Sequence, residues 1–470
     1  MTNLSGTNLN NGAAVGPQGE GRESPSRFPT YPAYKDSGGE WIGDIPDHWS
    51  SNPLKRAFKI EGGSTPTPDE VNWDGDIAWV TPADLSGLSS LFLGASKRTI
   101  TPTGLTSCGT TLLPAGSLIL STRAPIGSLA IALIRVCTNQ GCKGLVPNAD
   151  ASSNYFAYVL LTAKAELNNR GKGTTFLEIS GDELGRFVVP TPPFPEQTQI
   201  ARFLDHETAR IDALIEEQQR LIELLKEKRQ AVISHAVTKG LDPTVQMKDS
   251  GVEWLGEVPA HWTVRKVSVD FLASKGPRAA LLTKEYCHEN AGEYPVYSGQ
   301  TENGGILGEI ADFDIDLGAE GAILSTTVGA KAMSVMHISG RISLSQNCMI
   351  IRPFSAHVKV RFFFYHFQPL FSLERRMIPD HMQPSFRMED LYSFRVAVPP
   401  VSEQNQIAEY LDAAVNRFDE LIGEGDNGIA LLQERRSALI SAAVTGKIDV
   451  RGWQPPASTQ APESAVAEAN

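Results

Sequence analysis

Apolar residues recur every three or four positions along two long stretches of the chain, residues 196–238 and 403–445. This spacing places them on one face of an α-helix. The first stripe is Ile200, Leu204, Ile211, Leu214, Ile215, Leu221, Ile222, Leu225, Val232 and Ile233, and the second is Ile407, Leu411, Phe418, Leu421, Ile422, Ile429, Leu432, Leu439 and Ile440. A helix of 43 residues extends about 65 Å and would leave its stripe in water without a partner. We predict that the two stretches pack together as an antiparallel coiled coil.

Proline and glycine mark the ends and a weak point of these helices. Pro192-Pro193 and Pro399-Pro400 are expected to end a strand and begin the turn into each helix. Residues 423–428 of the second stretch contain three glycines, each costing about 1 kcal/mol relative to alanine inside a helix. The sequence therefore predicts a continuous first helix and a kink or local break in the second.

The remaining segments alternate short apolar runs with Gly, Pro, Asn and Ser, which is typical of β-rich folding. Residues 118–122 and 323–327 are expected to be strands, whereas residues 155–168 and 360–373 have helical patterns. The predicted fold class is α+β: two mixed α/β, β-rich domains with largely antiparallel pairing, joined by the two long helices.

The chain contains one long unit twice. Residues 35–49 and 248–262 are identical at ten of fifteen positions, and residues 196–205 return as residues 403–412. Loops drift in length, so the equal length of the two helical stretches indicates rigid elements. A unit that occurs twice predicts pseudo-two-fold symmetry and a partner that also has two halves.

These boundaries divide the chain into six expected segments. They are a disordered leader at 1–30, a globular domain at 31–190, a long helix at 191–243, a second globular domain at 244–395, a second long helix at 396–453 and a disordered tail at 454–470.

Composition narrows the class of protein. The chain has 470 residues, 41% of them hydrophobic, and no run of 18 apolar residues, so we expect a cytoplasmic protein without a membrane span. Its five cysteines form no CxxC pair, which favours reduced, mostly buried thiols over a zinc site or disulfides. Cys142 and Cys348 occupy matching places in the two units and are expected in the core.

A net charge of −12 is unusual for a protein that binds nucleic acid alone. The acidic excess lies outside the globular domains, because residues 50–190 contain 12 Lys/Arg and 11 Asp/Glu, and residues 263–395 contain 14 of each. The domains therefore have enough cations for basic faces.

The duplicated motifs resemble the specificity subunit of type I restriction–modification systems, over roughly residues 31–452. The motifs that carry the resemblance are Trp41-Ile42-Gly43-Asp44-Ile45-Pro46-Asp47-His48-Trp49, Pro192-Pro193-Phe194-Pro195-Glu196-Gln197, Gly62-Gly63-Ser64-Thr65-Pro66, residues 73–82, Tyr294-Pro295-Val296-Tyr297-Ser298-Gly299 and residues 438–449. Their order, duplication and spacing together are specific, although no single motif is decisive.

The resemblance implies that the two globular domains are target-recognition domains, each reading half of a split DNA sequence. It implies that the helices space these domains, that two modification subunits pack on them, and that this chain itself is non-catalytic. S-adenosylmethionine, ATP and Mg would be bound by partner subunits, including two restriction subunits, and this chain would carry no cofactor or metal. Major-groove half-sites on one DNA face lie about 34 Å apart, a separation that stiff helices can maintain.

Searches for catalytic motifs support a non-catalytic subunit. Thr191-Pro192-Pro193-Phe194 resembles the [DN]PP[FY] loop of amino-methyltransferases, but Thr replaces the amide or acid that holds the target amine. No Walker-type loop is present, and no acidic pair has the spaced lysine of a nuclease. His48 and His261 lie beside Trp and Pro, so we interpret them as packing or capping residues.

DNA contacts are expected from basic, amide and hydroxyl side chains in the polar, Gly-rich parts of each domain. The candidates are Thr65, Lys97, Arg98, Arg123, Lys143, Arg170, Lys172 and Thr174 in the first domain, and Ser298, Gln300, Lys331, Arg341, Arg375, Arg376 and Gln383 in the second. The basic residues Lys226, Lys228, Arg229, Arg435 and Arg436 lie near helix ends, where ion pairing explains them as well as DNA contact does.

Two other functions are consistent with parts of the pattern. A coiled-coil scaffold with two protein-binding modules would lack a sequence-specific, salt-dependent interaction with duplex DNA. A stand-alone methyltransferase would transfer a methyl group without partner subunits.

Overall fold

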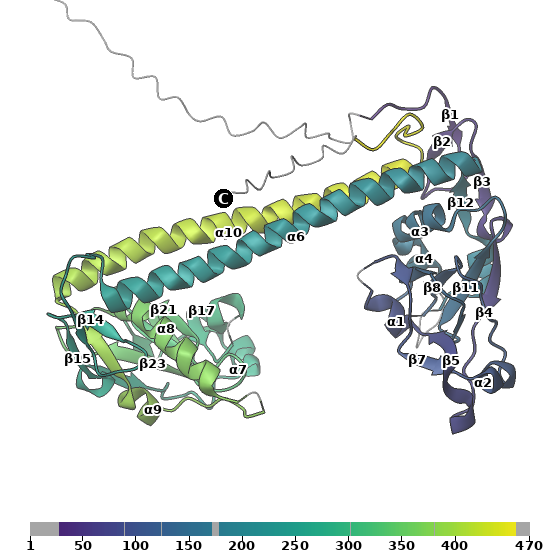
Figure 1. The fold of residues 1–470 in the computed structure, drawn as a ribbon. Coiled ribbons are helices and arrows are strands. Elements are labelled where there is room, and N and C mark those ends of the chain that lie inside the picture. The colour runs from purple at the N-terminus through teal and green to yellow at the C-terminus, as the bar shows by residue number, and fades with distance from the viewer. Residues whose placement is uncertain are drawn as a thin grey trace, which may run out of the picture. The chain divides into compact units, whose positions relative to one another are not determined.

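The computed structural model describes residues 28–88, 90–123, 125–171, 178–300, 302–379 and 381–456 (Figure 1). Most of the predicted leader and tail, and the candidates Lys172 and Thr174, lie outside these residues. The chain divides into two compact units: unit 1 comprises residues 1–216 and 430–470, and unit 2 comprises residues 217–429. Each unit therefore contains one globular domain and a part of both long helices.

Unit 1 is built from several small sheets. Its largest sheet has the strand order β4 (Phe58–Gly62), β11 (Cys142–Pro147), β8 (Leu118–Ser121), β9 (Leu129–Ala132) and β6 (Phe92–Leu93). A second sheet has the order β10 (Val136–Thr138), β5 (Trp73–Val80) and β7 (Arg98–Ile100), and two-stranded pairs are formed by β1 (Tyr34–Asp36) with β2 (Asp44–Pro46) and by β3 (Ser50–Pro53) with β12 (Val188–Thr191). The pairing is antiparallel except for β10–β5 and β6–β9, which confirms the expected largely antiparallel pairing.

Short helices complete unit 1. They are η2 (Leu54–Arg56), η3 (Glu70–Asn72), α1 (Pro82–Ser86), α2 (Pro102–Ser107), α3 (Ser153–Thr162), α4 (Lys164–Arg170) and α5 (Gly181–Arg186). The predicted helix at 155–168 is thus present as α3 and α4, with a turn at Ala163 between them.

Unit 2 repeats this plan with its own sheets. One sheet has the order β16 (Phe271–Ser274), β23 (Cys348–Pro353), β20 (Ala322–Thr326) and β21 (Val335–Ile338), and another has the order β18 (Ile306–Ile310), β17 (Ala291–Tyr297), β22 (Arg341–Leu344) and β19 (Ile315–Asp316). Two-stranded pairs join β13 (Met247–Asp249) to β14 (Glu257–Pro259) and β15 (Thr263–Lys266) to β24 (Arg395–Val398). The helices are η4 (Val267–Val269), α7 (Lys284–Glu289), η5 (Glu302–Gly305), α8 (Val360–Met377) and α9 (Met388–Ser393).

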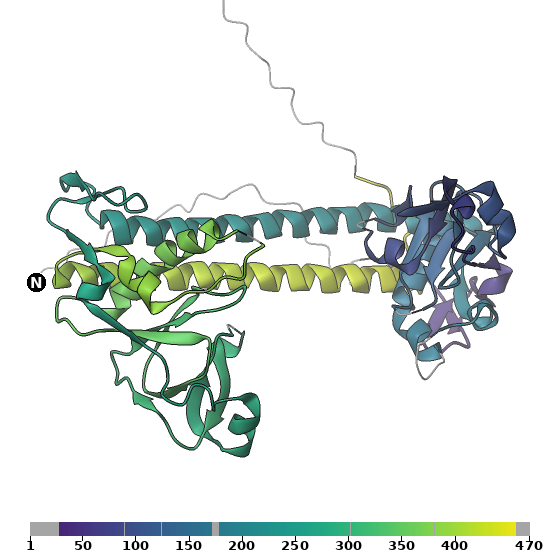
Figure 2. The same ribbon diagram turned by 90° about the horizontal axis from the view of Figure 1, so that it is seen from below.

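The long helices are α6 (Phe194–Lys239) and α10 (Val401–Val444), and they lie side by side in both views (Figures 1 and 2). Ion pairs join them in each unit: Asp212 Oδ1 lies 2.8 Å from Arg436 Nε, and Asp419 Oδ1 lies 3.0 Å from Arg229 Nε. The two residue numbers of each pair add to 648, so the helices run antiparallel in one register. Asp212 and Asp419, like Arg229 and Arg436, are also equivalent in the repeat, so the chain contains one interaction twice. The predicted antiparallel pair is confirmed.

The predicted break at residues 423–428 is wrong, because α10 is one helix from Val401 to Val444. Gly425 is buried against α6, where a Cβ would lie 2.9 Å from Ile222 Cγ1 and 3.2 Å from Gln218 Nε2. Packing on α6 holds this segment helical, although glycine by itself disfavours a helix.

Matched hydrogen bonds recur in the two units, within each domain and where it meets the long helices. Trp41 Nε1 donates to Val188 O, as Trp254 Nε1 does to Arg395 O. Gln197 Nε2 donates to Pro192 O, as Gln404 Nε2 does to Pro399 O. Tyr158 Oη donates to Asp205 Oδ1, as Tyr365 Oη does to Asp412 Oδ1, and all six bonds are between 2.6 and 3.2 Å long. The residues shared by the two units therefore make equivalent contacts, and the Tyr–Asp pairs join each domain to a long helix.

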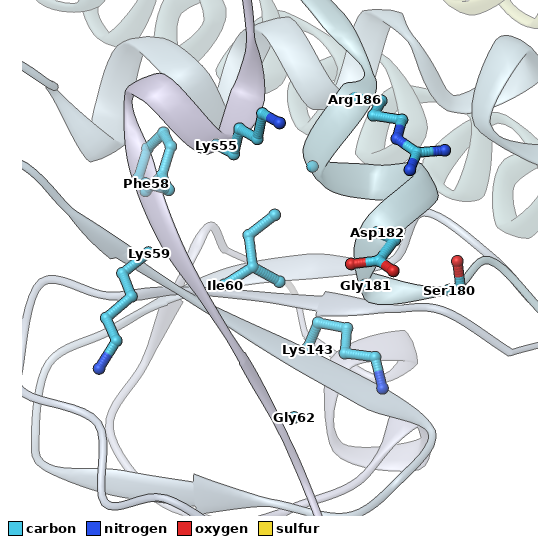
Figure 3. A pocket seen from close by; sticks show the side chains of 11 residues that line it. Lys55, Phe58, Lys59, Ile60, Gly62, Lys143, Ser180, Gly181, Asp182 and Arg186 are labelled. Carbon is cyan, nitrogen blue, oxygen red and sulfur yellow. The ribbon is translucent and has the colours of Figure 1, made fainter.

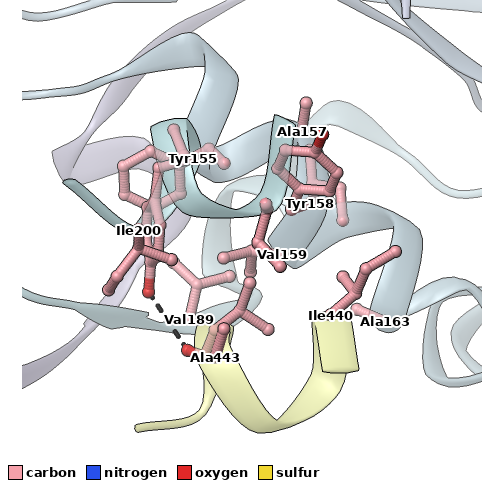
Figure 4. Packing of buried hydrophobic residues seen from close by; sticks show 14 of the residues in the cluster. Tyr155, Ala157, Tyr158, Val159, Ala163, Val189, Ile200, Ile440 and Ala443 are labelled. Carbon is pink, nitrogen blue, oxygen red and sulfur yellow. Dashed lines mark hydrogen bonds between the residues drawn. The ribbon is translucent and has the colours of Figure 1, made fainter. Parts of the chain in front are cut away.

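The core of unit 1 shows how both ends of the chain contribute to one unit. Tyr155 of α3 is buried and donates its hydroxyl to Val444 O at 3.1 Å, near the end of α10 (Figure 4). Ile200 of α6 and Ala443 of α10 lie in the same buried cluster. Asp449 N donates to Pro29 O at 2.7 Å, so the segment after α10 packs against the segment before β1.

Cysteine packing agrees with the sequence. All five cysteines are free, and Cys137, Cys142, Cys287 and Cys348 are buried. Burial raises the pKa of the Cys142 and Cys348 thiols to about 12, so both remain protonated at neutral pH. None of the described helices combines the length and hydropathy needed to cross a bilayer.

Candidate nucleic-acid interface

Three loops of unit 1 meet at one edge of its sheets. Thr122, which follows β8, donates its backbone N–H to Gly141 O at 2.9 Å and accepts from Ile179 N at 3.0 Å. The loop after β4 joins them, since Ser64 N donates to Thr138 O at 2.9 Å. We call residues 64–67, 97–98, 122–123, 139–141 and 178–180 the unit 1 edge.

Unit 2 builds an equivalent edge with the same backbone contacts. Thr327 N donates to Asn347 O at 2.8 Å, and Thr327 O accepts from Phe386 N at 2.7 Å. Ser345 N donates to Tyr297 O at 2.7 Å, which places the loop after β17 beside this turn. Residues 298–300, 327–331, 345–347 and 383–386 form the unit 2 edge. The frame is shared, whereas the side chains differ.

A tryptophan pair supports the unit 1 edge. The rings of Trp73 and Trp79 meet edge to face at 5.1 Å, and their Nε1 atoms donate to Thr67 O and Ser64 O, both at 3.0 Å. The guanidinium carbon of Arg98 lies 3.6 Å from the centroid of the Trp73 ring, a cation–π contact. Arg98 is exposed and has no carboxylate partner among the described residues, so the Trp73 ring holds a guanidinium that no ion pair neutralises.

Four further candidates from the first domain lie at or beside this edge. Thr65 Oγ1 donates to Gln140 Oε1 at 2.5 Å, and Arg123 Nε donates to Glu178 Oε2 at 3.0 Å. Lys97 is exposed, and its backbone N–H donates to an oxygen of Asp84. Lys143 of β11 pairs with Gly62, directly behind the loop that holds Thr65. The structure therefore brings together Thr65, Lys97, Arg98, Arg123 and Lys143.

Arg170 does not join this group. Its guanidinium pairs with Glu166 at 3.0 Å and Glu183 at 3.7 Å, and it lies 5.0 Å from the centroid of the Phe187 ring. These partners connect α4 to α5, so we assign Arg170 a packing role.

In unit 2, four candidates lie at the edge and a fifth supports it. Gln300 N donates to Ser298 Oγ at 3.3 Å, and these residues line a pocket of about 370 Å³ with Gln346 and Asn347. Lys331 and Gln383 are exposed. Arg375 extends from α8 to the same loops, where its Nη2 donates to Ala330 O at 3.5 Å.

Arg341 and Arg376 lie elsewhere in unit 2. Arg341 begins β22, at the opposite end from the turn, and pairs with Asp316 at 3.3 Å. Arg376 Nε donates to Ser372 O at 3.3 Å and so binds its own helix. Sequence reasoning missed Gln140, Gln346 and Asn347, although their matching positions beside Cys142 and Cys348 were visible in the repeat.

A second surface consists of exposed leucines on the long helices. Leu214 and Leu431 are 50% and 65% exposed in unit 1, and Leu421 and Leu224 are 41% and 54% exposed in unit 2. Leu214 matches Leu421 in the repeat, and Leu224 matches Leu431. By the register of the helices, each unit's pair lies within about one helical turn of the same level.

Two kinds of side chain bear on possible chemistry: clusters of metal ligands and the repeated histidines. No three His, Cys, Asp or Glu side chains among the described residues could hold a metal ion. His48 Nε2 contacts Glu196 Oε2 at 2.9 Å, and His261 Nε2 contacts Glu403 Oε2 at 2.8 Å. Both histidines thus contact the side chain of a glutamate in the first turn of a long helix, which is a packing contact between domain and helix.

Residues 46–225 and 261–429 match the family model described as type I restriction modification DNA specificity domain. The chain is 26% identical over 423 residues to the type I restriction enzyme MjaIX specificity subunit of Methanocaldococcus jannaschii, covering 87% of this chain and 95% of that protein.

Solved structures share the fold. A chain from work on complex assembly and conformational transition of the type I R-M system has a TM-score of 0.68, with 14% identity, covering 85% of this chain and 98% of that one. The HsdS subunit from Thermoanaerobacter tengcongensis has a TM-score of 0.51, also at 14% identity, covering 86% of this chain and 98% of that one.

Proposed function

This chain belongs to the family of type I restriction–modification DNA specificity proteins, and we propose that each of its two recognition domains reads one half of an asymmetric bipartite DNA target. The observation that carries this proposal is the pair of edges: they share a backbone frame and present different side chains. Equal frames hold both domains in equivalent positions on duplex DNA, whereas unequal side chains select different bases.

Base-edge and phosphate contacts are assigned to the candidates at these edges. They are Thr65, Lys97, Arg98, Arg123 and Lys143 in unit 1 and Ser298, Gln300, Lys331 and Gln383 in unit 2, with Arg375 in support. Gln140, Gln346 and Asn347 join them because amides can form bidentate hydrogen bonds with adenine. Lys172 and Thr174 stay in the proposal, because the segment 172–177 leads directly into Glu178 of the unit 1 edge.

The long helices set the spacing between the recognition domains, at 31–190 and 244–395, and bind the partner subunits. Their equal lengths and repeated ion pairs support a spacer function. The repeated exposed leucines support two equivalent docking sites, and hence two modification subunits per chain.

The chain acts without catalysis of its own. Methyl transfer from S-adenosylmethionine to adenine belongs to the modification subunits, and ATP-dependent cleavage belongs to restriction subunits. The partner subunits also supply part of the phosphate attraction that a chain of net charge −12 lacks.

Mapping methylated adenines in cells with and without this chain tests the proposal. We expect one split motif that disappears when the chain is deleted. Replacing residues 50–190 with the corresponding block of another family member should change one half of the motif and leave the other half intact. Unchanged methylation after deletion contradicts the proposal, and a change in both halves contradicts the modular reading.

A further inference from the structure

A basic groove lies beside the unit 1 edge, between β4, β11 and α5 (Figure 3). It has a volume of about 610 Å³, and the cations Lys55, Lys59, Lys143 and Arg186 line it. Asp182 is the one carboxylate among its described lining residues. The groove was not predicted from the sequence, since its four cations come from three separate segments.

Two glycines of α5, Gly181 and Gly185, line the groove. A Cβ at Gly185 would lie 3.4 Å from Ile60 Cδ1 and 3.5 Å from Lys55 Cβ, and a Cβ at Gly181 would lie 4.0 Å from Lys143 Cε. These are ordinary van der Waals distances, so β4 and the aliphatic part of Lys55 lie directly against α5. Lys55, Lys143 and Arg186 line the same groove.

Most of this positive charge is not neutralised within the described residues. Lys59 Nζ lies 2.6 Å from Glu61 Oε1, whereas Lys55, Lys143 and Arg186 form no ion pair with any described residue. Three cations that converge on a concave surface without carboxylate partners favour a bound anion.

The repeat provides an internal comparison. The positions that match Lys55, Lys59, Lys143 and Arg186 hold Ser268, Leu272, Met349 and Ser393 in unit 2. Two exchanges run the other way, because Gly62 matches Lys275 and Ser180 matches Arg387. The fold itself therefore does not require the four cations, since unit 2 builds the same elements without them.

We propose that this groove binds phosphates of the DNA backbone beside the half-site read by unit 1, and that unit 2, with two cations at the matching positions, lacks an equivalent groove of four cations. This inference rests on the proposed function. Continuity with the edge identifies DNA as the source of the phosphates: Lys143 pairs with Gly62, which precedes the loop of Ser64 and Thr65, and Ser180 follows Ile179 of the edge. A DNA strand bound along the unit 1 edge would therefore continue into the groove.

The test uses residues that the repeat already tolerates. The triple variant Lys55→Ser, Lys143→Met and Arg186→Ser gives unit 1 the residues of unit 2. Affinity of the complex with modification subunits is measured for target and non-target duplexes across a salt series. Each lost phosphate contact should make the slope of log K against log[salt] shallower by about 0.9, or about 2.7 for three. The ratio of target to non-target affinity should stay constant.

Controls separate the possible failures. Arg135→Ser removes an exposed cation from the loop between β9 and β10, at the far end of β10 from the edge, and should leave the slope unchanged. If the triple variant unfolds, the single variant Lys55→Ser replaces it, and its slope of log K against log[salt] should be shallower by about 0.9. A wild-type slope in the variant, or altered base preference at constant slope, overturns this inference alone. Absence of target discrimination in the wild-type complex instead overturns the proposed function.

Discussion

Two matching backbone carbonyls near the ends of the long helices are hydrogen-bonded by different side chains in the two units. Val444 O, near the end of α10, accepts from Tyr155 Oη at 3.1 Å, and Val237 O, at the matching place in α6, contacts His366 Nδ1 at 3.2 Å. A carbonyl can only accept, so Nδ1 carries the hydrogen. His366 is fully buried, and this burial lowers its pKa to about 3.

Acid should therefore destabilise unit 2 through His366. Its folded-state pKa lies below the ordinary value of about 6.5, so unfolding takes up a proton between these values. The free energy of unfolding should fall as pH falls from about 6.5 toward 3, by about 1.4 kcal/mol per pH unit from this residue. Above pH 7 His366 is neutral in both the folded and the unfolded state, so it no longer makes the free energy of unfolding depend on pH.

The double variant Phe362→Tyr and His366→Val copies Tyr155 and Val159 of unit 1 and checks this prediction. Its unfolding midpoint, measured at pH 7 and pH 5, should drop less than that of the wild type. The single variant Phe362→Tyr retains the histidine and should retain the full acid sensitivity. A parallel loss in the wild type and the double variant would show that other groups dominate.

At the scale of elements, one glycine changes how the two helices meet. Gly425 matches Gln218 in the repeat, yet the two residues lie against each other. They can do so because both are close to the pseudo-two-fold axis that relates α6 to α10. A small residue facing Gln218 and Ile222 allows close approach. Gly423 and Gly428 have nothing within 4 Å of a Cβ, so they contribute no such contact.

Substitutions at the three glycines should consequently act in opposite directions. Gly425→Leu must displace Ile222 and should lower the free energy of unfolding by about 1–3 kcal/mol. Gly423→Ala and Gly428→Ala add no clash and should raise it by about 0.4–1 kcal/mol each. Chemical denaturation of the three variants measures these changes. Equal effects at all three positions would mean that helix propensity alone decides.

At the scale of the whole molecule, each unit is assembled from both halves of the chain. The first part of α6 and the last part of α10 belong to unit 1, and the other parts belong to unit 2. Each unit consequently displays a matched pair of exposed leucines, one from each helix: Leu214 with Leu431, and Leu421 with Leu224; unit 2 also exposes Leu221 of α6. A partner that recognises such a pair finds it once in each unit.

Removing one pair should remove one partner. The double variant Leu214→Asp and Leu431→Asp should reduce the complex from two modification subunits to one, as measured by native mass spectrometry. The matched variant Leu421→Asp and Leu224→Asp should have the same effect, and the quadruple variant should bind none. Full occupancy in the quadruple variant would place docking on another surface.

The architecture was accessible from the sequence because it depends on local and repeated signals. Local patterns each constrain a short segment: the helical stripes, the Pro-Pro turns at Pro192 and Pro399, and the Trp motifs. Because the chain is duplicated, each of these patterns occurs twice and supports the same prediction twice. The error at residues 423–428 came from reading glycine by its intrinsic propensity. A packed helix such as α6 overrides that propensity, and no local pattern reports the packing.

Only part of the site was accessible in this way. Residue type and polar context pointed to Thr65, Arg98 and Gln300, but the same criteria selected Arg170 and Arg376, whose guanidiniums serve neighbouring helices. The groove cations Lys55 and Arg186 were missed because long-range folding alone brings them beside Lys143.

The sequence by itself determined the duplication, the two long helices, the β-rich class of the domains and the family. Tertiary structure decided which polar side chains share an edge, which cations lack partners and how a glycine serves a helix pair. The physical reason is the range of the interactions: periodicity and turn chemistry act within a few residues, whereas charge pairing and burial depend on segments distant in the chain.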